Sequence, residues 1–553
     1  MIIICRPTHE IVDKAVEFSL ILNQTDFYFI LIPGETYEII NFITGPGLGN
    51  RFTLNSFNID LIPIDNDLVS MEREGSFNQI YVDNDKTPIA DFVDSFTKLV
   101  LCFGKIKHKY IKGDRAKLFC DLVEKKEQET NLKTTDEILG MIVFDRNVDF
   151  LTPFSSNYTF EGLLDEHFGI NKGCIIIENS YLNVNENAKG KKEDNRKALY
   201  NLASNNANLL QNEIRCMNYL DANRYMNDLQ NYYLNQKKED SKDLKKLQSD
   251  IATFQYFIKN YKNPMIINRR FITKFIDENH KEDNMIYRAK EGIFLSGALP
   301  SNLKLFYDDY INEKKDFFKL INLFILESLT QGYIRDFATF KRDILNIYGY
   351  QNILLLRDLE KIGLINEKPP LIKIPTQTFY QQIRDKLNLI SPYADNIKSR
   401  YQDCSYIYQG YCPIILRLIE RAIEGKWGKN KDIISKIPGE TIFPEDESEI
   451  IKPPSEKKVH TIFVVFVGGV SYNEIEGIRF INRNLKLMYD KNKEKNPNST
   501  RIQLIIVTNE ILNKNKIFKS LGQDFSGPNY TFKKLHDDIE KEKKEKEKLK
   551  GKK

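Results

Sequence analysis

The 553-residue sequence has no apolar run long enough to cross a membrane as a helix. Its longest apolar stretch, from Thr461 to Val470, is about half of the roughly 20 residues that a bilayer span requires. The first residues, Met1-Ile-Ile-Ile-Cys-Arg-Pro7, also lack the basic region that begins a secretion signal. We therefore expect a cytosolic protein that reaches membranes only peripherally, through partners.

Cysteine and histidine are too few and too scattered to indicate disulfides or a metal centre. The seven cysteines are an odd set without a C-x-x-C pair, which predicts reduced and mostly buried thiols. The six histidines stand singly, with no H-x-x-x-H pair and no Cys/His cluster. The hydrolase motif G-x-S-x-G does not occur either. The sequence therefore predicts no catalytic residue, no metal and no cofactor.

An excess of positive charge is absent from most of the chain. The formal net charge is +4, but ten lysines and six acidic residues lie between Lys533 and Lys553, which leaves 71 basic and 71 acidic residues elsewhere. Nucleic-acid binding depends on clustered Lys and Arg that displace counterions. A neutral body argues against a nucleic-acid partner, and the Lys/Glu-rich stretch at 536–553 is interpreted as a solvated tail.

Glycine-rich phosphate-binding loops are also incomplete. Gly45-Pro-Gly-Leu-Gly49 has no following Lys-Ser/Thr, and Asn50 stands where a dinucleotide motif needs its third glycine. Gly468-Gly469 lies between a predicted strand and a predicted helix, where backbone N–H groups can bind an anion. A tight turn is the favoured interpretation, and a nucleotide-binding α/β enzyme is the less favoured alternative.

Charged residues follow another apolar strand. The apolar run that begins at Met141 ends in three charged residues, Asp145, Arg146 and Asp149. They suggest acid-base chemistry, a metal site, or an arginine clamped between carboxylates. The clamp, which would cap the strand and fix a domain boundary, is the favoured interpretation.

Apolar runs alternate with amphipathic segments in both terminal parts of the chain, which predicts an α/β class with open, mainly parallel sheets. Expected strands are 2–5, 27–32, 59–64, 79–82, 141–145, 461–467 and 502–507; expected helices are 8–22, 89–103, 114–127, 158–169 and 475–487. Ser471-x-x-Glu474 is a capping box, so 461–507 is predicted to form a βαβ unit.

The middle of the chain has helical spacing and almost no strand signal. Leu244, Leu247, Ile251, Phe254 and Ile258 recur at three and four residues, which places them on one helix face. An all-α insertion between two halves of an α/β domain fits this pattern. Because the first residues already form a core strand, the first domain is expected to be N-terminally shortened.

Several stretches resemble the SM (Sec/Munc) family, and within it the branch of vacuolar protein sorting-associated protein 33. They occur in family order: Asp60 to Glu72, Asp145 to Pro153 with Tyr158 to Glu166, Tyr348 to Ile353, Leu359 to Leu364, Gln409 to Ile414, and Val467 to Val470. The resemblance covers nearly the whole chain and implies a non-enzymatic, SM-type arch with two open α/β domains and an all-α insertion.

The resemblance also implies domain boundaries. They are domain 1 at 1–135, the first segment of domain 2 at 136–232, domain 3 at 233–398, the second segment of domain 2 at 399–535, and the tail at 536–553.

Two binding surfaces are implied by the same resemblance. The tip of domain 3, about 268–297, would hold SNARE helices of syntaxin-type and vesicle SNAREs through Phe271, Lys274, Ile286, Tyr287, Arg288 and Glu291. About half of these residues could instead be hairpin core. A docking face for the helical-repeat subunit vacuolar protein sorting-associated protein 16 would include Lys341, Tyr350 and Ile353, or those residues could form a corner between helices.

The implied function is chaperoning or templating of SNARE assembly for vesicle docking and fusion, as a subunit of the HOPS and CORVET tethers with their other subunits. The implied location is the cytoplasm, peripherally on late endosomes, lysosomes or vacuoles. A tether scaffold without SNARE binding is the second alternative.

Overall fold

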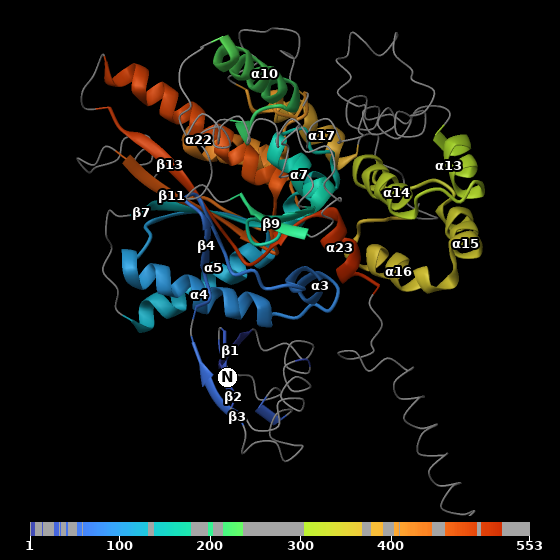
Figure 1. Cartoon of the computed structure of the whole chain (residues 1–553), viewed down its shortest axis with the longest axis horizontal. Coiled ribbons are helices and arrows are strands. Elements are labelled where there is room, and N and C mark those ends of the chain that lie inside the picture. The colour runs from blue at the N-terminus through green and yellow to red at the C-terminus, as the bar shows by residue number, and fades with distance from the viewer. Residues whose placement is uncertain are drawn as a thin grey trace, which may run out of the picture. The chain divides into compact units, whose positions relative to one another are not determined.

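The computed structural model (Figure 1) describes most of the chain in separate stretches. Apart from single positions, these are residues 2–5, 27–32, 52–57, 59–130, 138–178, 197–202, 214–235, 303–367, 378–390, 403–408, 410–444, 459–494 and 499–522. The chain divides into two compact units, one of residues 1–62 with 522–553 and one of residues 63–521.

The smaller unit contains a three-stranded parallel sheet in the order β1-β2-β3, formed by Ile2–Cys5, Phe27–Leu31 and Phe52–Ser56. In β2, Phe27, Phe29 and Leu31 are fully buried while Tyr28 between them is exposed. This alternation is the period of two that strand geometry imposes. The strands predicted at 2–5 and 27–32 are confirmed, whereas the helix predicted at 8–22 lies almost entirely outside the described residues.

The larger unit is built on a seven-stranded sheet in the order β10-β6-β7-β11-β13-β5-β4. The strands are β4 (Ile62–Asp65), β5 (Leu68–Ser70), β6 (His108–Lys112), β7 (Ile138–Asp145), β10 (Thr441–Ile442), β11 (Val459–Val467) and β13 (Arg501–Thr508). Strands β6, β7, β11, β13 and β5 run parallel, and β10 pairs antiparallel with β6. The sheet thus combines strands that are hundreds of residues apart in sequence.

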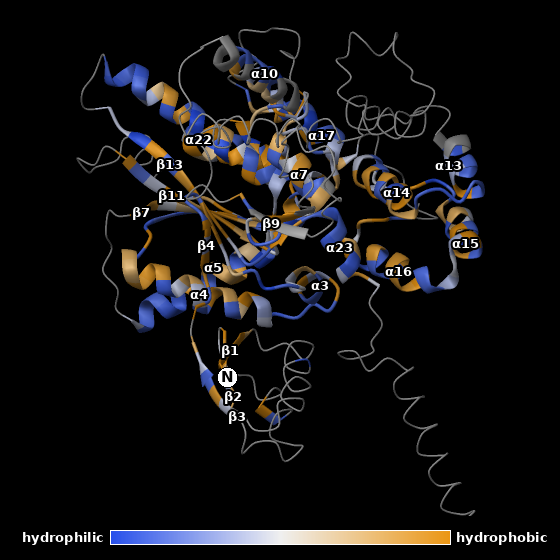
Figure 2. Cartoon of the chain, in the orientation of Figure 1, coloured by the Kyte–Doolittle hydropathy of each residue, from blue (hydrophilic) through white to orange (hydrophobic). Residues whose placement is uncertain are grey.

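Helices cover both faces of this sheet (Figure 1). On one side lie α3 (Ser76–Tyr81), α4 (Thr87–Phe103) and α5 (Asp114–Glu129), and on the other α7 (Phe160–Phe168) and α22 (Tyr472–Lys493). Because helices cover both faces of the sheet, the central strands β7, β11 and β13 are mostly apolar, with polar residues near the start of β11 and of β13 (Figure 2). All eight residues of β7 are buried.

The predicted βαβ unit is confirmed. Strand β11, helix α22 and strand β13 follow one another, and β11 pairs in parallel with β13 from Val459 opposite Arg501 to Phe466 opposite Thr508. The capping box is also present, because the Ser471 and Glu474 side chains each bond the other residue's backbone at the start of α22. The helices predicted at 89–103, 114–127 and 158–169 are likewise confirmed as α4, α5 and α7.

The strand predicted at 79–82 is wrong, because these residues belong to α3 and its C-terminal end. Phe77, Ile80 and Tyr81 are buried together, and their three- and four-residue spacing is that of one helix face. Gly75 precedes the helix with a φ of 81°. The strand predicted at 59–64 is shifted, since β4 begins only at Ile62 and the separate strand β5 follows it.

The described part of the predicted insertion contains only helices as regular elements. They are α13 (Leu303–Asn312), α14 (Phe317–Gln331), α15 (Phe337–Tyr348), the 3-10 turn η4 (Tyr350–Asn352), α16 (Ile353–Ile362) and α17 (Phe379–Lys386). Tyr307, Phe324 and Phe340 pack ring against ring at their centre, with centroids 4.5 to 5.6 Å apart. The helical segment predicted around 244–258, the tail and the domain boundaries stay predictions.

Candidate functional site

The six residues predicted to hold SNARE helices lie outside the described part of the chain, within 236–302. They are Phe271, Lys274, Ile286, Tyr287, Arg288 and Glu291. The docking-face residues Lys341, Tyr350 and Ile353, in contrast, are all described.

Tyr350 and Ile353 lie on one helical corner, formed by the end of α15, the turn η4 and the start of α16, whereas Lys341 lies about two turns before the end of α15. Lys341 of α15 forms an ion pair of 2.5 Å with Glu360 of α16. Both side chains are about one-third exposed, so solvent screens the pair and its net contribution to stability is on the order of 0–1 kcal/mol. The pair therefore links α15 to α16 but contributes little to the free energy of folding.

Backbone geometry fixes the turn between these helices. Gly349 ends α15 with a φ of 104°, and a Cβ atom there would lie 2.2 Å from the Gln351 side chain. Only glycine adopts this conformation without strain. The amide of Asn352 donates to the carbonyl oxygens of Tyr348 and Gly349, each at 3.1 Å, and thereby holds the turn closed.

The corner presents two apolar side chains to solvent. Tyr350 is 67% exposed and Ile353 is 46% exposed, whereas Leu355, Leu356 and Leu359 of α16 point into the core. The Tyr350 hydroxyl donates to Asn346 at 2.9 Å, which limits the ring's freedom. An exposed aromatic ring on a rigid corner loses little conformational entropy on binding, a property of interface hot spots.

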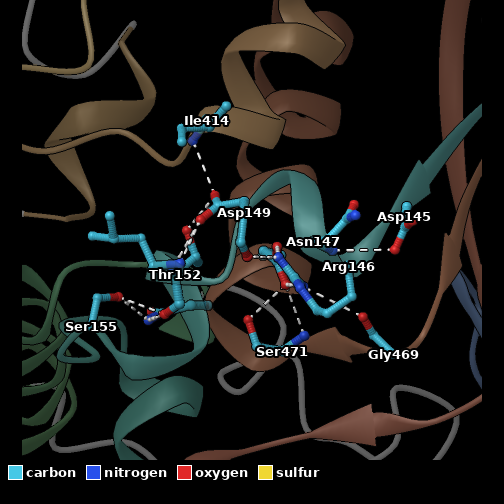
Figure 3. Close-up of polar contacts among 12 residues, drawn as sticks. Asp145, Arg146, Asn147, Asp149, Thr152, Ser155, Ile414, Gly469 and Ser471 are labelled. Carbon is cyan, nitrogen blue, oxygen red and sulfur yellow. Dashed lines mark hydrogen bonds and ion pairs between the residues drawn. The ribbon is translucent and has the colours of Figure 1, made fainter. Parts of the chain in front are cut away.

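The charged cluster after β7 is a buried junction (Figure 3). Arg146 is fully buried, and its guanidinium donates to both carboxylate oxygens of Glu474 at 2.6 Å. Burial disfavours the charged guanidinium, but the Glu474 carboxylate outweighs it and the pKa of Arg146 is raised. The predicted clamp is therefore corrected in one respect, because the paired carboxylate belongs to α22 and not to Asp145 or Asp149.

The two aspartates organise the backbone around this arginine. Asp149 accepts bonds from the backbone N–H groups of Leu151 and Thr152, each at 3.0 Å, and from that of Ile414 at 3.2 Å. Asp145 accepts from the Tyr81 hydroxyl at 2.6 Å. Carboxylates saturated in this way have no free oxygen to offer a substrate or a metal, and the described residues contain no cluster with metal-ligand geometry.

The turn at Gly468-Gly469 is filled by protein. A Cβ atom on Gly468 would lie 2.4 Å from the Tyr81 hydroxyl, and one on Gly469 would lie 2.5 Å from Leu512. The N–H of Gly468 donates to Asn509 at 2.9 Å, and the N–H of Val470 donates to a backbone carbonyl at 3.0 Å. These donors are therefore occupied, which disfavours the nucleotide-binding alternative.

Sequence reasoning missed a second buried ionic cluster next to this junction. Arg479 of α22 contacts Asp65, Asp67, Glu161 and Glu476 at 2.8 to 3.1 Å. The only signal in the sequence was an arginine, Arg479, among apolar residues of a predicted helix. Its acidic partners come from three separate places in the chain, namely Asp65 with Asp67, Glu161 and Glu476.

Two further findings bear on the predictions. All seven cysteines are free thiols and four of them are buried, as expected. Among the described residues, none of the helices is long and apolar enough to cross a bilayer.

Comparison with known proteins identifies similar chains across nearly the full length. Vacuolar protein sorting-associated protein 33A of Rattus norvegicus is 25% identical over 87% of this chain and 82% of its own. The corresponding homologue of Arabidopsis thaliana is 23% identical over 89% and 80%. The relative from Schizosaccharomyces pombe is 21% identical over 87% and 83%.

Solved structures of SM proteins share the fold. The Unc18–syntaxin 1 complex from Monosiga brevicollis matches with a TM-score of 0.55 and 13% identity, covering 94% of this chain and 87% of the other. The SM protein Vps45 in complex with the Qa SNARE Tlg2 gives 0.54 and 12%, covering 94% and 84%. The predicted SM-type α/β fold class is confirmed. The Sec1 family model matches residues 1–520, and the chain belongs to this family of non-enzymatic trafficking regulators.

Proposed function

We propose that the chain binds SNARE helices and promotes SNARE complex assembly for vesicle docking and fusion at late endosomes and lysosomes or vacuoles. Membership of the Sec1 family and relatives named for vacuolar protein sorting support this function. Two similar structures, at 12–13% identity, hold an SM protein together with syntaxin 1 or with a Qa SNARE.

The proposed tether contact is the corner of α15, η4 and α16. The observation that carries it is the exposed Tyr350 ring on a turn that Gly349 and Asn352 hold rigid. Next to it, Ile353 adds apolar surface, and farther back along α15 Lys341 adds a partly exposed cation that is paired with Glu360. We assign this surface to a helical-repeat subunit of the vacuolar protein sorting-associated protein 16 type, which would make the chain a HOPS or CORVET subunit.

The proposed SNARE contact is the tip at about 268–297. Phe271, Ile286 and Tyr287 supply apolar anchors for an amphipathic helix, and Lys274, Arg288 and Glu291 supply flanking charges. This assignment rests on the family resemblance and on the sequence.

A pull-down of the full chain against a panel of endolysosomal SNARE motifs, with and without the helical-repeat partner, tests both contacts. We expect Tyr287→Asp to abolish SNARE binding and retain the partner, whereas Tyr350→Asp abolishes partner binding and retains the SNARE. Met488→Asp is the matched control, because Met488 is 61% exposed on α22, belongs to neither proposed surface, and should retain both partners.

The outcomes separate the alternatives. Partner binding without binding of any SNARE motif would replace the proposed function by a tether scaffold. Binding of neither by a folded chain would overturn both contacts.

A further inference from the structure

A pocket of about 330 Å³ opens beside α22 and the first residues of β13, far from the corner of α15 and α16 in sequence. Its lining carries five cationic side chains and a single carboxylate, Asp67. The cations are Arg215, Arg479, Arg483, Lys486 and Arg501. This concentration of positive charge contrasts with the neutral balance of the chain outside its tail.

The inner wall of the pocket consists of two buried arginines that protein carboxylates already neutralise. Arg215 is 7% exposed and contacts Glu161 and Asp65, each at 2.7 Å. Arg479 is 6% exposed and contacts Asp67 at 3.1 Å. These ion pairs fix the inner wall, and they leave the outer cations to determine what the pocket attracts.

The outer wall is positively charged and uncompensated. Among the described residues, Arg483, Lys486 and Arg501 form no ion pair with a carboxylate. The Nε–H of Arg501 is buried without an acceptor in the described structure, while another of its nitrogens donates to Gln503 at 3.3 Å. Buried donors are nearly always satisfied in folded proteins, so this nitrogen calls for an acceptor from outside the described chain.

The outer wall is also preorganised. The Asn482 side chain donates to the Leu504 carbonyl at 2.9 Å and accepts from the Leu504 N–H at 2.8 Å, which joins α22 to β13. Arg483 and Lys486 are three residues apart on the exposed side of α22 and therefore lie on one helix face. The cations thus stand on two elements that are held together without a ligand.

We propose that this pocket binds a small anion that carries two or more phosphate groups. Guanidinium groups match phosphate oxygens in a bidentate fashion, and three unpaired cations on two elements suit several phosphates better than one. The volume lies at the lower end of the range for small-molecule sites. Clustered phosphates of this kind occur on soluble metabolites and on phosphorylated lipid headgroups, which share the same recognition chemistry.

Calorimetric titration of the full chain with inorganic triphosphate tests the site. We expect saturable binding that weakens at least tenfold in the Arg483→Glu/Lys486→Glu double variant. Both side chains are exposed, so the variant should keep the wild-type unfolding midpoint. The matched control is Lys491→Glu/Lys493→Glu, which makes the same charge change near the end of the same helix, outside the pocket, and should bind like the wild type.

A second readout uses the buried donor. Arg501→Gln should weaken triphosphate binding with a smaller salt dependence, because one cation fewer contacts the anion. Absence of triphosphate binding by the wild type, or equal weakening in the control double variant, would overturn the proposal.

Vesicles distinguish the two sources of the anion. Phosphatidylcholine vesicles with phosphatidylinositol bisphosphate that capture the wild type, but not the Arg483→Glu/Lys486→Glu variant, would identify a lipid headgroup. Triphosphate binding without vesicle capture would identify a soluble ligand. Vesicle capture that the double variant retains, together with no triphosphate binding, would overturn the pocket as the site.

Discussion

Two cation–glutamate pairs each join two elements of the larger unit, yet they differ in their physical roles. Arg146 and Glu474 are fully buried, bidentate and 328 residues apart in sequence, whereas Lys341 and Glu360 are about one-third exposed and only 19 residues apart. Removing one partner of a buried pair leaves the other charge unsolvated and unpaired in the protein interior. Removing one partner of an exposed pair costs little, because water solvates the remaining charge. The buried pair therefore holds the end of β7 to α22, whereas the exposed pair contributes little to the stability of the helical region that it joins.

The largest expected effect is at the buried pair. Glu474→Gln keeps a side chain that can cap α22 but leaves the Arg146 charge unpaired, and we expect a loss of about 3–5 kcal/mol. Denaturant unfolding followed by the fluorescence of Trp427, the single tryptophan and fully buried in this unit, measures it. Adding Arg146→Met to Glu474→Gln should recover part of the loss, since no charge remains stranded. A double variant less stable than Glu474→Gln would contradict this account.

A buried glutamate with a phenol partner gives an intermediate effect that depends on pH. Glu327 of α14 accepts a bond from the Tyr307 hydroxyl at 2.7 Å, and burial raises its pKa from 4.5 to about 7. The folded state holds a proton that the unfolded state has released, so the stabilising contribution is complete below pH 4.5 and is lost as pH rises through about 7. Relative to the wild type, Glu327→Gln should gain less than about 1 kcal/mol at pH 5 and about 3 kcal/mol at pH 8.

Unfolding midpoints of the wild type and Glu327→Gln at both pH values provide the measurement. Asp165 and Glu510 are also buried carboxyls, with pKa values raised to about 6 and about 7. Because they titrate in both proteins, only the difference between the wild type and Glu327→Gln reports on Glu327. An equal gap between wild type and variant at pH 5 and pH 8 would show that Glu327 does not titrate in this range.

The smallest effect is expected at the helical corner. Lys341→Ala should change the free energy of unfolding by less than about 1 kcal/mol, and added salt should erase even that difference. The same variant should weaken partner binding measurably if the corner is the docking surface. If Lys341→Ala instead lowered the free energy of unfolding by several kcal/mol, the exposed pair would be as important for stability as the buried one, and the comparison would be wrong.

The sequence was most informative where neighbouring residues decide the structure. Continuous apolar runs identified β7, β11 and β13, and the Ser471 capping box located the start of α22. The segment 79–82 misled because four residues contain too few periods to separate a strand from a helix, and the burial of Phe77 upstream decides the matter. Periodicity alone does not carry such information for short segments.

Distant pairing could not be predicted in the same way. Glu474 was identified as a capping residue, but its second role as the partner of Arg146 depends on β7 and β11 lying side by side. The docking residues came from family resemblance, and only the structure shows that Tyr350 is exposed and that Gly349 fixes its turn. Exposure is a property of the folded chain that no local pattern encodes.

The order of strands in the large sheet has a consequence for biosynthesis. Strand β7 is buried along its whole length and pairs on one side with β11, so that edge of β7 is synthesised more than 300 residues before its partner strand. At ordinary rates of elongation this interval is on the order of tens of seconds. During that time the unpaired edge of β7 is available to pair with other polypeptides. Production of the chain in cells should accordingly depend on chaperones that shield that edge until translation has passed Val467.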